Sequence, residues 1–190
     1  MSDKIVVALQ NHNALLERSL AHEAGTLEDI AQRIVETFNG GGRLFIAAGG
    51  SLGWLAEVLA TCLLHRLEVE RPALPVQALS LSRELATALC QAGQFDQFYT
   101  GQLQSLVRGG DCLLLLDEAA DLPLLAALPV AKELDCPVAV LSVAEREAWL
   151  EAEADLVVSL DASTRTRGRE VLLVYVHLLC ELIEAELFGF

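Results

Sequence analysis

The sequence has few basic residues, few aromatic residues and no long apolar run. Of its 190 residues, 13 are Lys or Arg and 27 are Asp or Glu, so the formal net charge is −14. This charge repels nucleic acid and anionic membranes, and it opposes anionic substrates unless a local site overrides it. No apolar run reaches the roughly 18 residues of a membrane span, and the start at Met1 lacks a signal-peptide pattern. We therefore expect a cytoplasmic protein with no direct nucleic-acid or membrane partner.

The five cysteines lack the spacing of a metal-binding or redox motif. Their number is odd, no two form a CxxC pair, and each lies in an apolar run. This pattern predicts small buried hydrophobic residues in a reducing compartment. The residues are Cys62, Cys90, Cys112, Cys136 and Cys180.

The apolar content is high enough for a large core. Hydrophobic residues make up 53% of the chain and charged residues 21%, which excludes a disordered chain. The length predicts one domain over residues 1–190. Helical spacing over 2–22, a break at Gly25 and a second helix start at Thr26 predict a pair of N-terminal helices within 1–39.

After three glycines the pattern changes to short apolar runs that alternate with helical segments. Such an order predicts a three-layer α/β sandwich over 43–190, with a five-stranded parallel, flavodoxin-like sheet. The predicted strands are 43–48, 76–79, 111–116, 137–142 and 156–160. The predicted helices are 52–66, 82–92, 95–107, 121–134, 145–151 and 167–187.

Ligands of such sheets bind beyond the carboxyl ends of the strands. Two predicted loops lie there, at 49–53 and 117–122. The first begins with Gly49, Gly50 and Ser51. Its glycines permit a tight turn whose backbone N–H groups can hold an anion, and the serine can bind phosphate or cap the next helix.

Four segments along the chain carry a family pattern. They are GGGRLFIAAGGS (40–51), RLEVERPALP (66–75), FDQFYTGQLQSLVRGGDCLLLL (95–116) and REVLLVYVHLLCELIEAELF (169–188). In these segments the chain resembles the SIS-domain phosphosugar proteins, and within them the phosphoheptose isomerase group. The resemblance covers nearly the full chain and implies an SIS fold.

The family's isomerisation of sedoheptulose 7-phosphate uses a hydroxyl-rich phosphate loop and a carboxylate base. Where the resemblance places that loop, residues 117–122 read DEAADL, without a hydroxyl and with three carboxylates. We interpret Asp121 as a helix N-cap. The base position falls on Thr61 or Cys62, neither of them a carboxylate, and Glu57 is the one acid on that helix to replace it.

The last helix matches the family in part. His177 matches the catalytic histidine and Glu170 an acidic residue before it, while Arg169 stands where the family has a glutamine. One of four zinc ligands remains, so we expect no metal and no cofactor. A reactive pair of Cys62 with His177 is a further alternative.

These comparisons with the family predict a protein without catalytic residues. We expect an oligomeric binding or regulatory protein, a homodimer or homotetramer, whose partner is a carbohydrate derivative or a protein. The predicted ligand-binding residues are Gly49, Gly50, Ser51, Arg169 and His177. The family includes one such non-catalytic case, the DnaA-initiator-associating protein. The alternative is an active sedoheptulose 7-phosphate isomerase with altered site residues.

Overall fold

A five-stranded sheet forms the centre of the computed structural model, which describes residues 3–68, 70–79 and 83–189. All neighbouring strands are parallel, in the order β2-β1-β3-β4-β5. This is the predicted flavodoxin-like sheet, and each predicted strand overlaps an observed one. The strands are β1 (Leu44–Ala48), β2 (Val76–Ala78), β3 (Cys112–Asp117), β4 (Val138–Ser142) and β5 (Leu156–Ser159).

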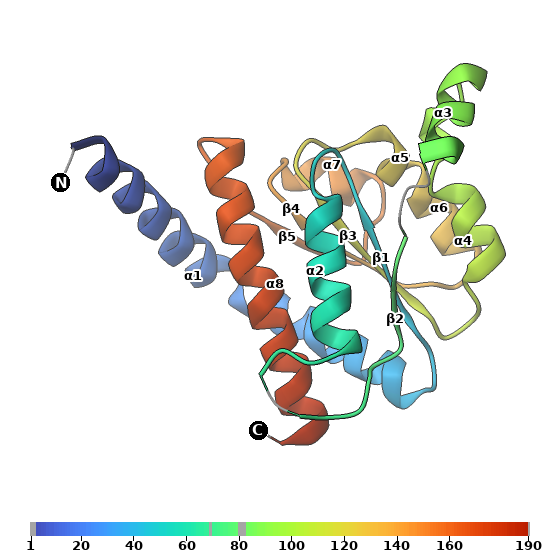
Figure 1. Ribbon diagram of the computed structural model, residues 1–190, viewed down its shortest axis with the longest axis horizontal. Helices are drawn as coiled ribbons and strands as arrows, with labels where there is room; N and C mark the ends of the chain where they lie inside the picture. The colour runs from blue at the N-terminus through green and yellow to red at the C-terminus, as the bar shows by residue number, and fades with distance from the viewer. Residues whose placement is uncertain (1–2, 69, 80–82, 190) are drawn as a thin grey trace.

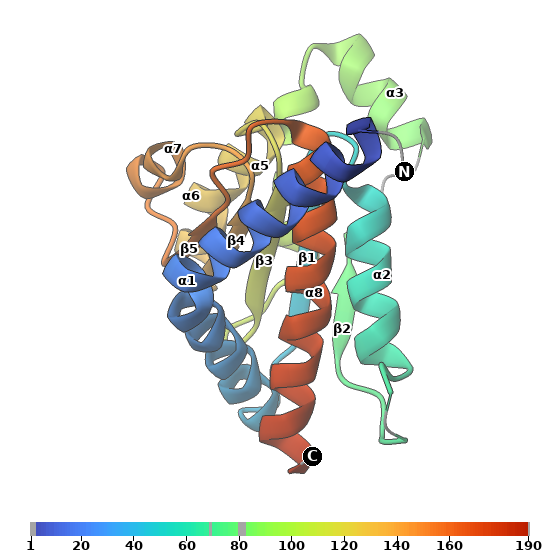
Figure 2. The same ribbon diagram turned by 90° about the vertical axis from the view of Figure 1, so that its left-hand side faces the viewer.

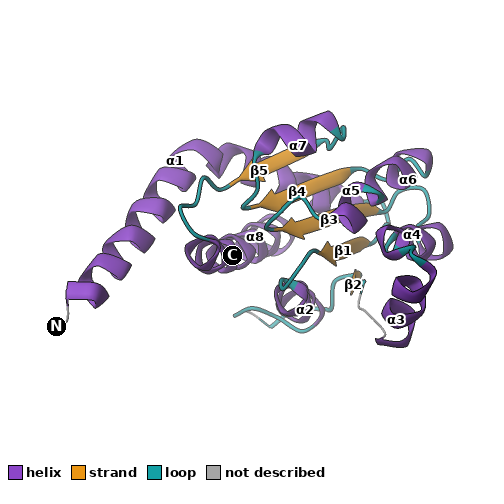
Figure 3. Cartoon of the chain, turned by 90° about the horizontal axis from the view of Figure 1, so that it is seen from above, coloured by secondary structure: helices purple, strands orange, loops and turns teal. Residues whose placement is uncertain are grey.

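Helices cover both faces of the sheet, because alternate side chains of each central strand enter opposite cores. In β1, Leu44 and Ile46 belong to the core under α1, α2 and α8, whereas Phe45 and Ala47 belong to the core under α4, α5, α6 and α7. Figure 3 shows the three layers from above. The helices of the first layer are α1 (Asp3–Asn39), α2 (Gly53–Leu64) and α8 (Arg165–Phe188). Those of the second are α4 (Thr100–Leu106), α5 (Leu122–Leu125), α6 (Ala127–Glu133) and α7 (Arg146–Glu151).

The N-terminal region is one helix, so the predicted helical pair is wrong. α1 runs without a break from Asp3 to Asn39 and passes through Gly25. A glycine inside a helix costs only about 1 kcal/mol. Packing on both sides of it, by Leu15 and by Leu27 and Ile30, keeps the helix continuous. Figures 1 and 2 show α1 lying across α8 and extending away from the sheet at its N-terminal end.

Two other predicted helices are interrupted. The segment predicted at 121–134 forms α5 and α6, because Pro129 has no N–H to continue the helical ladder toward Leu125. The segment predicted at 95–107 forms a 3-10 turn (η1, Phe95–Gln97) followed by α4. Phe98 and Tyr99, between the two elements, are both buried in the core on this face of the sheet.

The remaining helices agree with the sequence patterns. α8 begins at a Thr164 side chain that accepts the Arg167 N–H, and it ends at Gly189 in a left-handed conformation. α3 (Arg83–Ala92) contacts η1 and has no buried residue. The first residue of its predicted range, 82, lies outside the described residues. Cys90 of α3 is exposed, contrary to the expectation that all five cysteines are buried. No helix in the described ranges is long and apolar enough to cross a membrane.

Candidate functional site

A cleft lies between the carboxyl ends of β1 and β3, where the strand order reverses. Its cavity of about 780 Å³ is lined by the Ala48–Gly50 turn, by the segment around Phe95 and Tyr99, and by the start of α5. This volume is within the range of small-molecule sites. Parallel sheets of this kind bind ligands at such a position.

The glycine turn is packed too tightly for any side chain. The Gly49 N–H donates to the Leu116 carbonyl at 2.8 Å, which ties the end of β1 to β3. A Cβ on Gly49 would lie 2.5 Å from Asp121 Oδ2 and 2.6 Å from Asp117 Oδ1. Gly50 has φ +54°, a left-handed conformation that favours glycine. Gly49 and Gly50 both line the cleft, and their role in ligand binding stays a prediction.

Ser51 does not cap α2, contrary to one of its two predicted roles. The helix begins at Gly53, and its N-cap residue Leu52 makes no side-chain capping bond. Instead the Ser51 hydroxyl donates to Glu118 Oε1 at 3.3 Å. A hydroxyl that follows β1 thus meets a carboxylate that follows β3.

Asp117 is fully buried at the end of β3 and accepts the backbone donors of its own loop. Its Oδ2 receives the N–H of Ala119 at 2.9 Å and of Ala120 at 2.5 Å, and Oδ1 receives that of Asp121 at 3.3 Å. Burial raises the pKa of Asp117, and these N–H groups oppose the rise. The loop amides therefore already bind an anion, the carboxylate of the chain itself.

Glu118 forms a two-pronged ion pair with Arg169 of α8. Nε of Arg169 lies 2.6 Å from Oε2, and Nη2 lies 2.9 Å from Oε1. The Glu118 side chain is 5% exposed and that of Arg169 is 37% exposed. The hydrogen bond from Arg169 holds the pKa of Glu118 below its usual value, although burial opposes this. Arg169, a predicted ligand residue, is thus already paired.

Asp121 occupies the N-cap position of α5, but its side chain makes no capping bond. Its backbone carbonyl accepts the N–H groups of Leu124 and Leu125. Asp121 is thus the N-cap residue, as interpreted, but its carboxylate lies near Gly49 and lines the cleft instead of bonding to the first N–H groups of α5. Asp96 lines the same cleft.

The positions considered for a general base do not line the cleft. Glu57 and Thr61 of α2 are exposed, and Cys62 is partly buried. The Cys62 thiol lies beside the Cys180 thiol, and burial raises its pKa. A thiol with a raised pKa is protonated at neutral pH and is a poor base.

The remaining predicted residues of α8 face other surroundings. Glu170 accepts a hydrogen bond from His12 Nδ1 of α1 at 2.9 Å and pairs with Arg167. His177 is partly buried and makes no hydrogen bond to the described residues. Within those residues no three His, Cys, Asp or Glu side chains form a group that could hold a metal. The expected absence of a cofactor and the ligand role of His177 stay predictions.

Residues in the range 93–99 form a wall of the cleft that no sequence pattern predicted. Phe95 is 43% exposed and Asp96 lies next to it. The buried Tyr99 hydroxyl donates to the Ala48 carbonyl at 2.6 Å. This bond ties the wall to the end of β1 across 51 residues of sequence. No local pattern signals a contact over that separation.

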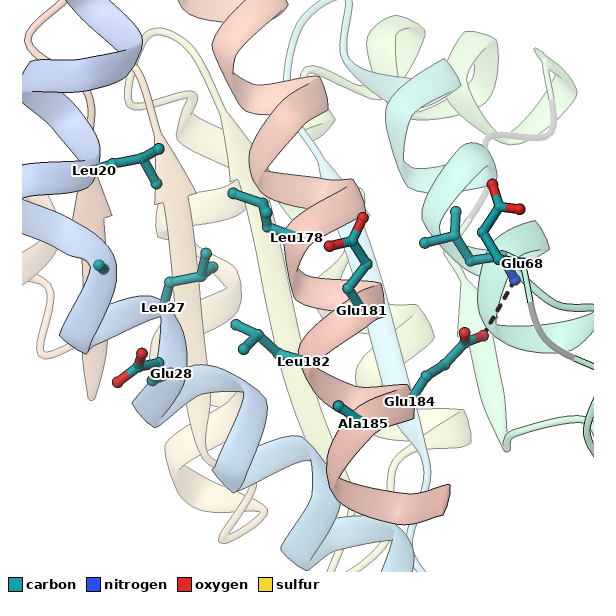
Figure 4. A pocket seen from close by; sticks show the side chains of 11 residues that line it. Leu20, Leu27, Glu28, Glu68, Leu178, Glu181, Leu182, Glu184 and Ala185 are labelled. Atoms are coloured by element: carbon teal, nitrogen blue, oxygen red, sulfur yellow. Dashed lines mark hydrogen bonds between the residues drawn. The ribbon is translucent and has the colours of Figure 1, made fainter. Parts of the chain in front are cut away.

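A second hollow, of about 510 Å³, lies between α1, α8 and the connection after α2 (Figure 4). Leu20 and Leu27 of α1 and Leu178 and Leu182 of α8 face it, and glutamates stand around it. Leucine side chains make up much of its lining, and none of its lining residues belongs to the cleft at the glycine turn.

The strand order, the glycine turn after β1 and the cleft at the reversal of strand order agree with the SIS domain that the sequence segments resemble. No family model matches the chain. It is 30% identical over 194 residues to a phosphoheptose isomerase of Pelobacter propionicus, covering 100% of both chains. It is 29% identical over 190 residues to one of Trichlorobacter lovleyi, covering 100% of this chain and 96% of that protein.

The fold agrees with a solved structure of the same group. A phosphoheptose isomerase from Francisella tularensis superposes with a TM-score of 0.86 at 24% identity, covering 96% of this chain and 98% of that one. The chain belongs to the phosphoheptose isomerase family.

Proposed function

We propose that this family member binds a ligand or partner without catalysing isomerisation, as an oligomeric regulatory protein. One observation carries the proposal. Donors near the ends of β1 and β3 serve carboxylates of the chain: amides of the loop after β3 bind Asp117, while Ser51 after β1 and Arg169 of α8 bind Glu118. Donors engaged in this way are withdrawn from a phosphate group.

The charge of the cleft supports a ligand without phosphate. Asp96 and Asp121 line it, and its lining within the described residues includes no Lys, Arg or His. A carboxylate about 5 Å from one phosphate charge adds roughly 3 kcal/mol of repulsion at an effective dielectric of 20. Phe95, which is 43% exposed, offers aromatic surface on the same wall. A neutral carbohydrate derivative fits this chemistry, with a protein partner as the other expected class.

The proposal is tested by an isomerase assay with sedoheptulose 7-phosphate, run at high protein concentration with and without zinc. We expect no turnover and no heat of binding in a calorimetric titration at millimolar ligand. The Pelobacter propionicus relative is the positive control in the same buffers. Turnover by this chain, or micromolar binding of the phosphorylated sugar, would overturn the proposal.

The second candidate is an active phosphoheptose isomerase with altered site residues. It is favoured by the full-length similarity to relatives that carry this name. It requires a base other than a carboxylate at the position of Thr61 or Cys62, or a movement that brings Glu57 to the ligand. The same assay decides between the two candidates.

Oligomer formation is part of the proposal. The N-terminal turns of α1 extend from the sheet and carry Ile5, Val7 and Leu9, each more than half exposed. The leucine-lined hollow between α1 and α8 adds a further apolar surface. A second copy that covers these surfaces gives a dimer or tetramer with two-fold symmetry. Sedimentation equilibrium should show such a species, and a monomer at micromolar concentration would contradict it.

A further inference from the structure

The Glu118 carboxylate is surrounded in the way that proteins surround a bound anion. Both of its oxygens contact Arg169, at 2.6 and 2.9 Å, and one of them also accepts the Ser51 hydroxyl at 3.3 Å. Arginine in a two-pronged contact, joined by a hydroxyl donor, is a common arrangement for carboxylate and phosphate recognition.

The Glu118 carboxylate packs against the glycine turn after β1. A Cβ on Gly50 would lie 3.1 Å from Glu118 Oε1, so the carboxylate rests against the turn. The Glu118 side chain is only 5% exposed, whereas Arg169 is 37% exposed. Nε and Nη2 of Arg169 are thus occupied by Glu118, while part of the arginine side chain is open to solvent.

The backbone holds Glu118 in this place. Asp117, the preceding residue, is fixed by the N–H groups of Ala119 and Ala120, and Ala120 has φ +52°. A non-glycine residue in the left-handed region is uncommon and is maintained by such contacts. Asp117 therefore accepts hydrogen bonds from loop amides, while Glu118 accepts them from Ser51 and Arg169.

The geometry points to Glu118 as a specificity-determining residue: its carboxylate fills an anion subsite formed by Ser51 and Arg169 and thereby excludes phosphorylated ligands. This inference rests on the proposed function, since it names the residue that restricts the ligand to one without phosphate. It predicts that the donors of the subsite become available once the internal carboxylate is removed.

The experiment measures binding of inorganic phosphate by isothermal titration at constant ionic strength. The wild type is compared with Glu118→Ser, which opens space, and with Glu118→Gln, which keeps the shape and removes the charge. Glu147→Gln, an exposed carboxylate of α7, controls for the change in net charge. We expect Glu118→Ser to bind phosphate about tenfold to a hundredfold more tightly than the wild type and the control.

Arg169→Ala in the Glu118→Ser background identifies the donor. This double variant should lose the gained affinity, because the two-pronged contact is absent. Near-ultraviolet circular dichroism checks that each variant is folded. If Glu118→Ser does not fold, Glu118→Gln decides the test, with a smaller expected gain in phosphate affinity. Equal phosphate binding by wild type and folded Glu118 variants overturns the inference, and so does a gain that persists without Arg169. Turnover of sedoheptulose 7-phosphate by the wild type is a separate result, which overturns the proposed function.

Discussion

Removal of the Glu184 carboxylate leaves a buried arginine without its ionic partner. Arg71 lies in the connection between α2 and β2, and its side chain is 1% exposed, while that of Glu184 on α8 is 6% exposed. Arg71 Nε donates to Glu184 Oε1 at 2.7 Å, and the same oxygen accepts the Leu67 N–H at 3.2 Å. The pair therefore fixes the connection to the last helix.

The structure sets the expected cost of breaking this pair. Loss of one partner of a buried ion pair costs about 3–5 kcal/mol. The Arg71 guanidinium keeps three acceptors, the carbonyls of Cys62 at 2.8 Å, Leu63 at 2.8 Å and Pro72 at 3.0 Å. We therefore expect the lower end, about 3 kcal/mol of unfolding free energy, for Glu184→Ala. Glu184→Gln keeps an acceptor and loses only the charge, so about half of that cost is expected.

The assay is urea unfolding at pH 7 followed by circular dichroism. All variants are compared at one protein concentration, because association contributes to stability. Glu186→Ala on the same helix, an exposed glutamate, is the control and should change the unfolding free energy by no more than about 0.5 kcal/mol. The melting temperature of Glu184→Ala should fall by roughly 6–12 °C. If Glu184→Ala lowers the unfolding free energy by no more than Glu186→Ala does, the reasoning is refuted.

Three further variants test other features of the structure. Gly25→Ala should stabilise the protein by about 0.5–1 kcal/mol in urea unfolding, because nothing lies within 4 Å of its Cβ position in α1; no gain would argue against a continuous helix. Gly168→Ala should destabilise it by about 1–3 kcal/mol, since the new Cβ would lie 2.5 Å from Val143 Cγ1, and adding Val143→Ala should recover most of the loss. Glu118→Gln should be less stable than the wild type at pH 7, and this gap should narrow as the pH falls below the ordinary glutamate range. Arg169 lowers the folded-state pKa of Glu118, so the contribution of the carboxylate is present above the ordinary glutamate pKa and is lost as the pH falls through the folded value. A gap between the two proteins that is constant with pH would contradict this last expectation.

The sheet was predictable because a parallel strand buried on both faces has an apolar side chain at every position. The run from Cys112 to Leu116 is such a case, and all of its residues are buried in β3. The two loops at the carboxyl ends followed from the same pattern. The sequence predicted two N-terminal helices where the structure has one. The free-energy cost of Gly25 in a helix is small, so packing along α1 decides whether the helix continues.

The sequence also determined which residues are present at the ends of the strands. It showed that the loop after β3 has three carboxylates and no hydroxyl, where the resemblance to the family implies a hydroxyl-rich loop. It did not show which donors those carboxylates take. Glu118 and Arg169 are separated by 51 residues, as are Ala48 and Tyr99, and no local periodicity connects positions so far apart.

By itself, then, the sequence determined the layer architecture and the chemical types at the cleft, because apolar periodicity and loop position depend on neighbouring residues. Only the tertiary structure decided that adjacent carboxylates, Asp117 and Glu118, face different partners. Asp117 binds amides of its own loop, whereas Glu118 meets a serine after β1 and an arginine on α8. The physical reason is that a hydrogen bond or ion pair forms between groups within about 3 Å, and the packing of the elements sets those distances.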